Sequence, residues 1–393
     1  MGMIKEMEGI KTTQEKDKEY VANTYQRFDL CLLKGKNATV TNDNGKEYID
    51  FTAGIGVNSL GFCDDLWIEA ITHQLALLQH CSNLYYNLPS TELAQELIKR
   101  TEFKKVLFVN SGAEANEGAI KIARKYGNSS GDRNEIITLE GSFHGRTMAT
   151  LTATGQGSYH KNFQPFVNGF SYGDINIESI KSLLTEKTCG ILLELIQGEG
   201  GVRVLPISFV QEVEKLCQDH DLVFMVDEVQ TGMGRTGALF AYEGYNCHPD
   251  ILTFAKGIGA GLPLGGVLLG EKVKDVLEPG DHGSTFGGNP VICAGALVVL
   301  ARLTPEFLKE VENKGQNIMK ELRAMNLVKN VDGRGLMIGF QVENQEAKEV
   351  AQRALKEGLM VLTAKDRVRL LPPLTISKEE IRKGLDILKK VIG

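Results

Sequence analysis

The sequence predicts an α/β protein in which a large domain with a mostly parallel sheet is joined to a smaller α+β domain. Short, almost entirely apolar segments alternate with amphipathic helical segments from about residue 90 to residue 290. Strands that are apolar throughout are typical of a parallel sheet covered by helices on both faces. After residue 290 the regular alternation stops, which indicates a second unit of different architecture.

We expect three parts along the 393 residues. Residues 1–48 form an N-terminal arm and part of the small domain, residues 49–290 the large domain, and residues 291–393 the C-terminal small domain. The first twenty or so residues are polar and predict the arm. The segment 36–51 predicts a hairpin, because two alternating runs flank the turn dipeptide Asn44-Gly45.

The strands and helices of the large domain are predicted from their hydrophobic patterns. Apolar residues recur at helical spacing in 91–100, 114–127 and 208–220, and Gly127 is expected to end the second helix. Apolar runs predict strands at 106–110, 135–140, 189–196, 222–227, 250–255 and 266–270.

The C-terminal unit mixes helices and strands. Its expected elements are a long helical region at about 291–325, a strand at 331–342, a helix at 346–358, strands at 359–364 and 367–371, and a last helix. Ser377 and Glu380 form a capping box at the start of that helix, and Ile381, Leu385 and Leu388 share one face of it.

Composition and charge exclude several classes of protein. With 42% hydrophobic and 24% charged residues the chain has the balance of an ordinary globular protein. The net charge is −6 and the basic residues are scattered, so nucleic-acid and membrane partners are not expected. No apolar run is long enough to span a membrane and the N-terminus lacks a signal-peptide pattern, so we expect a cytoplasmic protein. Seven irregularly spaced cysteines without a C-x-x-C pair, and no H-E-x-x-H, predict neither disulfides nor a metal site.

Three predicted strands are followed directly by residues that could carry chemistry, and ligands of such sheets bind at the carboxyl ends of the strands. Ser111-Gly112-Ala113 lies between a strand and a helix, where free N–H groups and the helix dipole favour a phosphate. Asp227 ends a second strand. Lys256 follows a third strand and precedes a glycine-rich segment, where loss of hydration would make its amine a nucleophile.

Each of these features alone also has an ordinary structural explanation: tight packing, a helix cap or a surface lysine. A different alternative comes from Gly232, Gly234 and Gly237, which match the G-x-G-x-x-G pattern of nicotinamide dehydrogenases. That pattern should open a helix directly after a strand. Here several residues separate it from the strand and no amphipathic helix follows, so this alternative is disfavoured.

Taken together, the three strand ends match the needs of pyridoxal 5'-phosphate. Its phosphate needs fixed N–H donors, its pyridine nitrogen needs an acid, and its aldehyde needs a lysine for a Schiff base. Few other cofactors need this set of groups.

At these residues the sequence resembles the class III aminotransferases, a family of pyridoxal phosphate enzymes with the fold type I architecture. The resemblance runs from about Tyr25 to the C-terminus, through the blocks NSGAEANEGAIKIAR, SFHGRT, ELIQGEGGV, VDEVQTGMGRTG, FAKGIGAGLPLGG and GSTFGGNP. Two departures concern loop shape rather than chemistry. Leu195 stands where the family usually has proline, and the segment 61–65 reads GFCDD in place of G-H-x-H-P.

The resemblance implies a role in cofactor binding for individual residues. Lys256 would form the Schiff base and later move the proton, and Asp227 would pair with the pyridine nitrogen. Thr285 would reach the cofactor phosphate of the neighbouring subunit, which implies a homodimer. The other cofactor contacts would come from Ser111, Gly112, Ala113, Phe143 and Gln230.

The resemblance also implies a ping-pong transamination between an ω-amino donor and 2-oxoglutarate. The donor expected is N2-acetyl-L-ornithine, with ornithine, 4-aminobutyrate and succinyldiaminopimelate as alternatives. Arg146 and Arg369 would bind carboxylates, and Glu199 would pair with Arg369 whenever the ω-amino substrate is bound. The remaining expectations are Ser284 beside the substrate, Glu194 as a carboxylate lining the site, His144 as a loop hydrogen bond, and Tyr25 with the segment 82–87 shaping the choice of donor.

A non-catalytic relative that serves as a binding or regulatory module is a further alternative. Such a protein would have little need of Lys256. The presence of that lysine together with Asp227 and both arginines therefore favours an enzyme.

Overall fold

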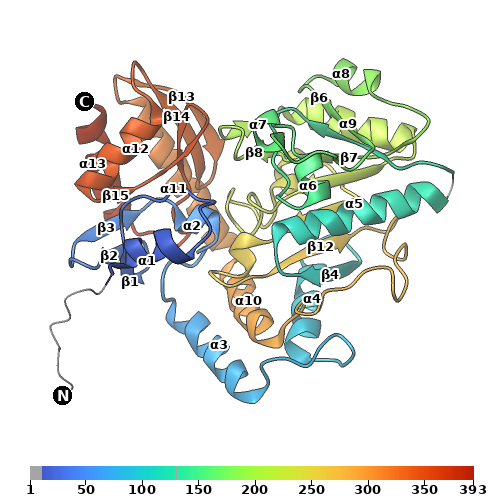
Figure 1. Ribbon diagram of the computed structural model, residues 1–393, viewed down its shortest axis with the longest axis horizontal. Helices are drawn as coiled ribbons and strands as arrows, with labels where there is room; N and C mark the ends of the chain where they lie inside the picture. The colour runs from blue at the N-terminus through green and yellow to red at the C-terminus, as the bar shows by residue number, and fades with distance from the viewer. Residues whose placement is uncertain (1–10, 130) are drawn as a thin grey trace.

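The computed structural model describes residues 11–129 and 131–393, and its central feature is a seven-stranded sheet (Figure 1). The order across this sheet is β4 (Lys105–Val109), β12 (Gly265–Leu269), β11 (Ile251–Phe254), β10 (Val223–Asp227), β7 (Thr188–Leu193), β5 (Glu135–Leu139) and β6 (Phe170–Gly173). Only β12 runs antiparallel to its neighbours. The predicted α/β class with a mostly parallel sheet is confirmed.

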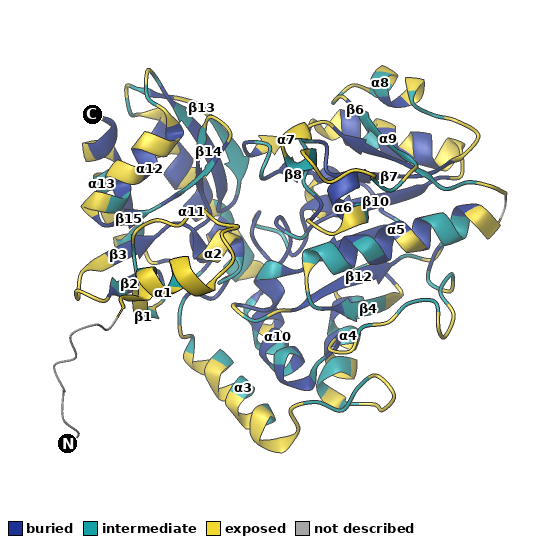
Figure 2. Ribbon diagram, in the orientation of Figure 1, coloured by how far each residue is buried: buried dark blue, intermediate teal, exposed yellow. Residues whose placement is uncertain are grey.

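Helices cover both faces of this sheet, which explains why its strands are apolar throughout. Val223 and Met225 of β10 pack in one cluster with α5 (Gly112–Ser129). Phe224 and Val226 point to the other face and pack in a second cluster with α9 (Ile207–Asp219). Figure 2 shows the resulting buried strands between helices that expose one side only.

The rest of the large-sheet region consists of short helices and loops that carry several of the predicted site residues. These helices are α3 (Asp65–Leu77), α4 (Leu88–Lys99), α6 (Met148–Ala153), α7 (Gly157–His160), α8 (Ile177–Ser182) and the 3-10 helices η1 (Ala241–Tyr245) and η2 (Lys256–Ile258).

The helix expected to end at Gly127 continues to Ser129, so that boundary is wrong. A Cβ on Gly127 would lie 2.3 Å from the carbonyl oxygen of Arg133 and 2.6 Å from Cβ of Cys189. The glycine therefore allows the helix to approach a neighbouring loop and strand closely, and it does not terminate the helix.

Four segments that are expected to be single elements are divided in the structure. One of them, the strand expected at 359–364, forms β15 (Leu359–Met360) and β16 (Leu362–Ala364), which belong to two different small sheets. The run 189–196 leaves the large sheet after Leu193, and its end forms β8 (Ile196–Gln197), which pairs with β9 (Arg203–Val204). The region 291–325 breaks into α10 (Pro290–Arg302) and α11 (Pro305–Arg323), because a residue before proline disfavours the helical conformation. The strand 331–342 is a hairpin of β13 (Val328–Arg334) and β14 (Met337–Val342), turning at Gly335 with φ 52°.

The smaller sheets are built from both ends of the chain. The first has the order β1 (Leu32–Lys36), β2 (Thr39–Asn42), β3 (Glu47–Asp50) and β15 (Leu359–Met360). The predicted hairpin at 36–51 is therefore confirmed. The second contains β13, β14, β17 (Arg367–Leu370) and β16 (Leu362–Ala364), with α12 (Ala347–Glu357) and α13 (Lys378–Ile392) packed nearby. The capping box of Ser377 and Glu380 is present, whereas the domain limits at residues 48 and 290 stay predictions.

The described part of the N-terminal arm contains α1 (Thr13–Tyr20), which buries no residue, and the short turn α2 (Ala53–Gly56) lies further along the chain. The prediction that the N-terminus lacks a signal-peptide pattern concerns residues 1–10 in part, and these lie outside the described residues. Across residues 11–129 and 131–393, no single helix is long and apolar enough to cross a membrane. By length and composition alone, α10 and α11 meet that test as a pair bent by 76° at its break.

Candidate active site

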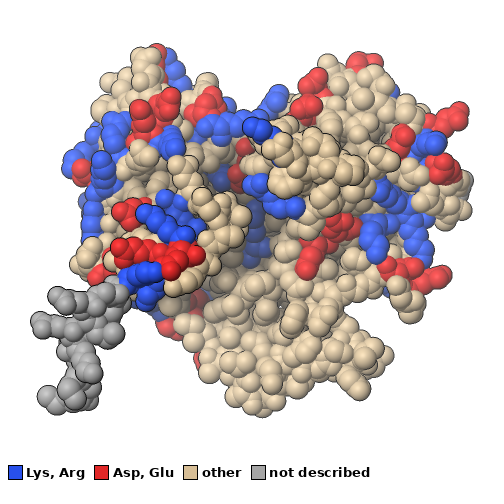
Figure 3. Space-filling view, viewed as in Figure 1, with Lys and Arg blue, Asp and Glu red and all other residues tan. Residues whose placement is uncertain are grey.

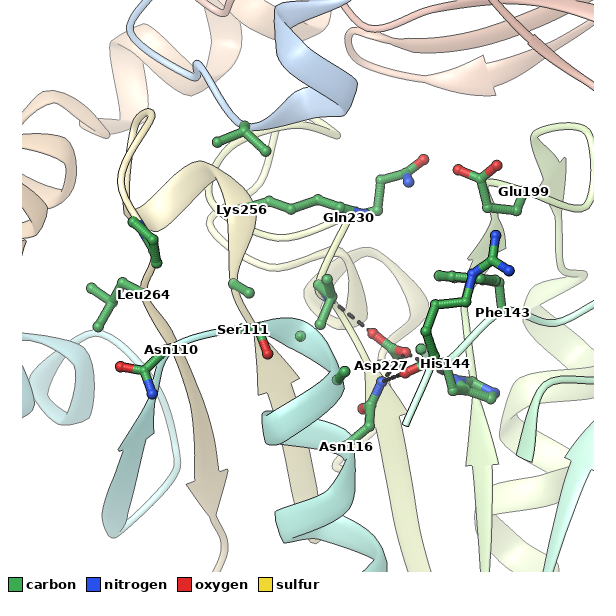
Figure 4. Close-up of a pocket in the computed structure, with 18 of the residues that line it drawn as sticks. Asn110, Ser111, Asn116, Phe143, His144, Glu199, Asp227, Gln230, Lys256 and Leu264 are labelled. Atoms are coloured by element: carbon green, nitrogen blue, oxygen red, sulfur yellow. Dashed lines mark hydrogen bonds and ion pairs between the residues drawn. The ribbon is translucent and has the colours of Figure 1, made fainter. Parts of the chain in front are cut away.

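A cavity of about 430 Å³ opens where several strands of the large sheet end (Figure 4). The residues after β4, β7, β10 and β11 meet there, as expected for the carboxyl edge of a parallel sheet. The predicted residues that line it are Ser111, Gly112, Ala113, Phe143, Arg146, Glu194, Glu199, Asp227, Gln230 and Lys256.

The N-terminus of α5 forms one wall of the cavity. Gly112 and Ala113 are its first residues, and within the described chain their backbone N–H groups have no hydrogen-bond acceptor. Ser111 Oγ accepts a bond of 3.2 Å from the next N–H, that of Glu114. A Cβ on Gly112 would lie 2.5 Å from a methyl of Val229, so only glycine permits this turn. Free N–H groups at the positive end of a helix fit a phosphate.

The carboxylate of Asp227 is held at the end of β10 by donors from three directions. Its Oδ2 accepts from Asn116 Nδ2 at 2.7 Å and from His144 Nδ1 at 2.8 Å, and its Oδ1 accepts from the backbone of Val229 at 3.0 Å. Asn116 is fixed in turn by a hydrogen bond of 2.7 Å from the Thr253 hydroxyl. These three donors fix the orientation of the carboxylate at the end of β10.

The interpretation of His144 as an ordinary loop hydrogen bond is therefore wrong. Its ring is buried, contacts Asp227 directly and lines the cavity. In its hydrogen bond with Asp227, Nδ1 donates when it carries the proton, because a carboxylate oxygen accepts.

Lys256 follows β11 and begins η2 with a φ of 48°, a left-handed conformation that is rare for a residue with a side chain. Its side chain extends across the cavity (Figure 4) and has no hydrogen bond or ion pair within the described chain. Burial lowers the pKa of its amine. A neutral, unpaired amine in a cavity is the form of lysine that attacks a carbonyl carbon.

Two further polar side chains face the cavity from the other side. Glu194 follows β7, accepts a hydrogen bond of 2.8 Å from the backbone of Phe143, and has a pKa raised well above its usual range by burial and by the charge of Asp227. Gln230 Oε1 is buried and has no hydrogen-bond partner among the described residues. An unsatisfied amide oxygen next to Lys256 fits a polar group of a bound cofactor.

At the rim of the cavity two arginines have different kinds of partner, one an acid and the other an aromatic ring. Arg369, in β17, is buried and forms a 2.6 Å ion pair through Nη1 with Glu199, while no described residue is a hydrogen-bond partner of its Nε. Arg146 lies over the ring of Tyr159, with its Cζ 4.2 Å from the ring centroid. The structure therefore places both predicted arginines and Glu199 together.

Ser284 and Thr285 lie outside this cavity, in a hollow of about 360 Å³ on the far side of Asn110. Asn110 Nδ2 donates to Ser284 Oγ at 3.0 Å, and Asn110 also lines the main cavity. Thr285 does not line the cavity at the N-terminus of α5 in its own chain. Its contact with the cofactor phosphate of a neighbouring subunit therefore stays a prediction.

The sequence interpretation missed Asn116 and Tyr159. A signal for Asn116 existed, because it is the polar member of an apolar helical face with Ala115, Ala119 and Ile120. Tyr159 carried no comparable pattern.

The glycine pattern at 232–237 does not form a dinucleotide loop. Gly234 and Gly237 have φ of 84° and 91° in a chain of turns, and the next element, η1, starts only at Ala241. Between the glycines, the buried Arg235 donates to the carbonyl of Leu336 at 3.1 Å, which ties this loop to the β13–β14 hairpin.

Comparisons with known proteins agree with this geometry. An acetylornithine aminotransferase of Haemophilus ducreyi is 49% identical over 96% of this chain and 97% of its own length. The solved ornithine aminotransferase of Toxoplasma gondii has a TM-score of 0.92 at 32% identity, covering 98% of this chain and 96% of its own. The solved N-acetylornithine aminotransferase of Stenotrophomonas maltophilia has a TM-score of 0.83 at 34% identity, covering 96% and 97%. Residues 20–392 match the family described as aminotransferase class III, and the chain belongs to that family.

Proposed function

We propose that this protein transfers the amino group of N2-acetyl-L-ornithine to 2-oxoglutarate, giving N-acetyl-L-glutamate 5-semialdehyde and L-glutamate in arginine biosynthesis. The observation that carries the proposal is the meeting of Lys256, Asp227 and the free N-terminus of α5 in a single cavity with two arginines at its rim. The names of the relatives from Haemophilus ducreyi and Stenotrophomonas maltophilia support acetylornithine as the donor.

The cofactor is pyridoxal 5'-phosphate, and the residues present fit it. The N–H groups of Gly112 and Ala113 would hold the phosphate, with Ser111 assisting, and Asp227 would face the pyridine nitrogen. Phe143 would lie against the ring, and Gln230 would satisfy its orphaned Oε1 on a polar group of the ring. When bound, the cofactor supplies an electron sink for the carbon that carries the amino group.

The protein contributes proton transfer and charge. Lys256 Nζ, whose pKa is lowered by burial, would take a proton from the substrate carbon that carries the amino group and would deliver it to the cofactor carbon that receives the amino group. Asp227 is held in place by Asn116 and His144, and it would stabilise a positive charge on the pyridine nitrogen of the cofactor during the reaction.

The two substrates are distinguished by charge at the rim. Acetylornithine brings one carboxylate and an amine at its far end, so Arg146 binds the carboxylate while Glu199 keeps Arg369 neutralised. 2-Oxoglutarate has two carboxylates, and its second carboxylate replaces Glu199 on Arg369. One cavity thereby accepts both substrates in turn.

We further propose a cytoplasmic homodimer in which Thr285 reaches the partner's cofactor phosphate and Ser284 lies beside the substrate. In support, α3 buries no residue, and the surface around it exposes large apolar side chains with few charges in view (Figure 3). These exposed side chains are Leu66, Leu75, Leu77, Leu84, Tyr85, Tyr86 and Phe286. Light scattering of the purified protein should give about twice the 43.1 kDa chain mass.

The proposal is tested by kcat/KM for a panel of donors with 2-oxoglutarate as acceptor. Acetylornithine should give the highest value. The likeness to the Toxoplasma gondii ornithine aminotransferase makes ornithine the second candidate, and a higher value for ornithine would change the substrate while keeping the reaction. No transfer from any ω-amino donor would refute the proposal.

A further inference from the structure

Arg146 is held by aromatic rings instead of by an acid. Within the described chain its guanidinium makes no ion pair and no hydrogen bond to protein. Its Cζ lies 4.2 Å from the ring centroid of Tyr159 and 5.6 Å from that of Phe143. The two rings meet edge to face with their centroids 5.5 Å apart. A guanidinium over the face of a ring is attracted by the quadrupole of the ring.

The geometry separates two ways of fixing an arginine. A carboxylate binds the N–H edge of the guanidinium, as Glu199 does at 2.6 Å from Arg369 Nη1. An aromatic ring binds its face and leaves the N–H donors unused. Tyr159 can therefore fix Arg146 without competing with a substrate carboxylate.

The position of Tyr159 is stabilised by the contacts of its neighbour in α7. It belongs to α7, and the neighbouring His160 bonds through Nε2 to the carbonyl of Leu151 at 2.9 Å and packs 5.0 Å from the ring of Phe166. Burial and the negative charge of Glu199 raise the pKa of the Tyr159 hydroxyl, so the phenol stays neutral. Figure 1 shows α7 at the edge of the large-sheet region that faces β13 and β14.

We propose that Tyr159 is a positioning residue, which holds the Arg146 guanidinium by its face so that its N–H edge meets the carboxylate of each substrate. The inference rests on the proposed function and goes beyond it by adding a residue outside the predicted set.

The test compares three variants of the cofactor-loaded protein. Tyr159→Leu removes the aromatic ring, and Tyr159→Phe keeps it. The control Tyr20→Leu makes the same change at an exposed tyrosine at the end of α1, over whose ring the amine of Lys11 lies. The measurements are the Kd of glutarate, an unreactive dicarboxylate, by calorimetry, and KM and kcat for acetylornithine. Tyr159→Leu should raise Kd and KM about 3- to 30-fold with little change in kcat, while the other two variants bind like the parent.

A double variant separates positioning from general damage. In an Arg146→Gln background, Tyr159→Leu should weaken glutarate binding no further, because the group on which it acts is gone. A donor that lacks the carboxylate, N-acetyl-1,4-diaminobutane, should react equally with the parent and with Tyr159→Leu. Melting temperatures identify a variant that does not fold, and Tyr159→Met then replaces Tyr159→Leu.

Two results would overturn the inference: equal losses in Tyr159→Phe and Tyr159→Leu, or an undiminished Tyr159→Leu effect on Arg146→Gln. Its failure is distinct from failure of the proposed function. A parent that transfers no amino group but binds glutarate through Tyr159 and Arg146 refutes only the function. An active parent whose glutarate binding ignores Tyr159→Leu refutes only the inference.

Discussion

The two ends of the cavity are built differently. At the inner end, both oxygens of Asp227 have donors, and the partners Asn116 and His144 are themselves buried and fixed. At the rim, Arg146 pairs with no acid in the part of the chain that the structure describes, and Glu199 on Arg369 is an acid that another carboxylate can replace. The inner end suits a cofactor that stays bound, and the rim suits two substrates that come and go.

Lys256 lies between these two regions and belongs to neither arrangement. Its amine is unpaired among residues 11–129 and 131–393, and its pKa is lowered by burial in spite of nearby acids that raise it. The comparison therefore predicts that a change at Lys256 costs most, a change at the fixed end less, and a change at the rim least.

The largest loss is expected for Lys256→Ala, because no other amine lines the cavity within the described chain. Turnover should fall on the order of 10⁴-fold or more, since nucleophile and proton carrier disappear together. Circular dichroism should show an intact fold. A fully active variant would contradict the mechanism.

A smaller loss is expected for Asp227→Asn at the fixed end. The side chain keeps its shape but loses its charge, and its amide group would meet the donors Asn116 and His144. We expect kcat to fall about 100- to 1,000-fold and the cofactor to bind more weakly, as measured by single-turnover kinetics and equilibrium dialysis. Asp250→Asn, the same change at a strand start outside the cavity, is the matched control for stability. Equal activity in both variants would show that the charge of Asp227 is not needed.

At the rim, Glu199→Gln should change the balance between substrates more than the rate. Arg369 loses its 2.6 Å ion pair and stays positive when acetylornithine binds. We expect kcat/KM for acetylornithine to fall about 10-fold relative to that for 2-oxoglutarate. Parallel losses for both substrates would indicate that Glu199 only supports the local fold.

The smallest effect concerns pH. Burial disfavours the ammonium form of Lys256, so its amine is neutral at a lower pH than a lysine with the usual pKa of 10.5. The rate at which cofactor-free protein takes up pyridoxal phosphate should therefore reach its plateau with a midpoint below pH 10.5. A midpoint at or above that value would show that burial does not control the pKa of this amine.

The fold and the inner end of the site could be predicted because both follow from the pattern of a parallel sheet. Apolar runs located the strands, and residues such as Asp227 and Lys256 had to meet wherever parallel strands ended together. Two of the errors came from single glycines whose effect depends on distant neighbours. Gly127 serves a close approach to Cys189, and Gly335 turns a presumed strand into a hairpin.

The rim could be predicted only through the family resemblance. Arg146, Glu199 and Arg369 lie far apart in the sequence and meet because β17 packs beside the loop after β8. Tyr159 was missed and His144 was misinterpreted for a related reason. An aromatic ring under a guanidinium, or an imidazole against a carboxylate, leaves no periodic signal in the sequence.

The most direct test of the account is the visible absorption of the purified, cofactor-loaded protein before and after addition of N2-acetylornithine without a keto acid. We predict a yellow protein whose visible band bleaches on addition of acetylornithine and returns with 2-oxoglutarate. Lys256→Ala should not complete this cycle. A protein that stays colourless after incubation with pyridoxal phosphate would contradict the central claim.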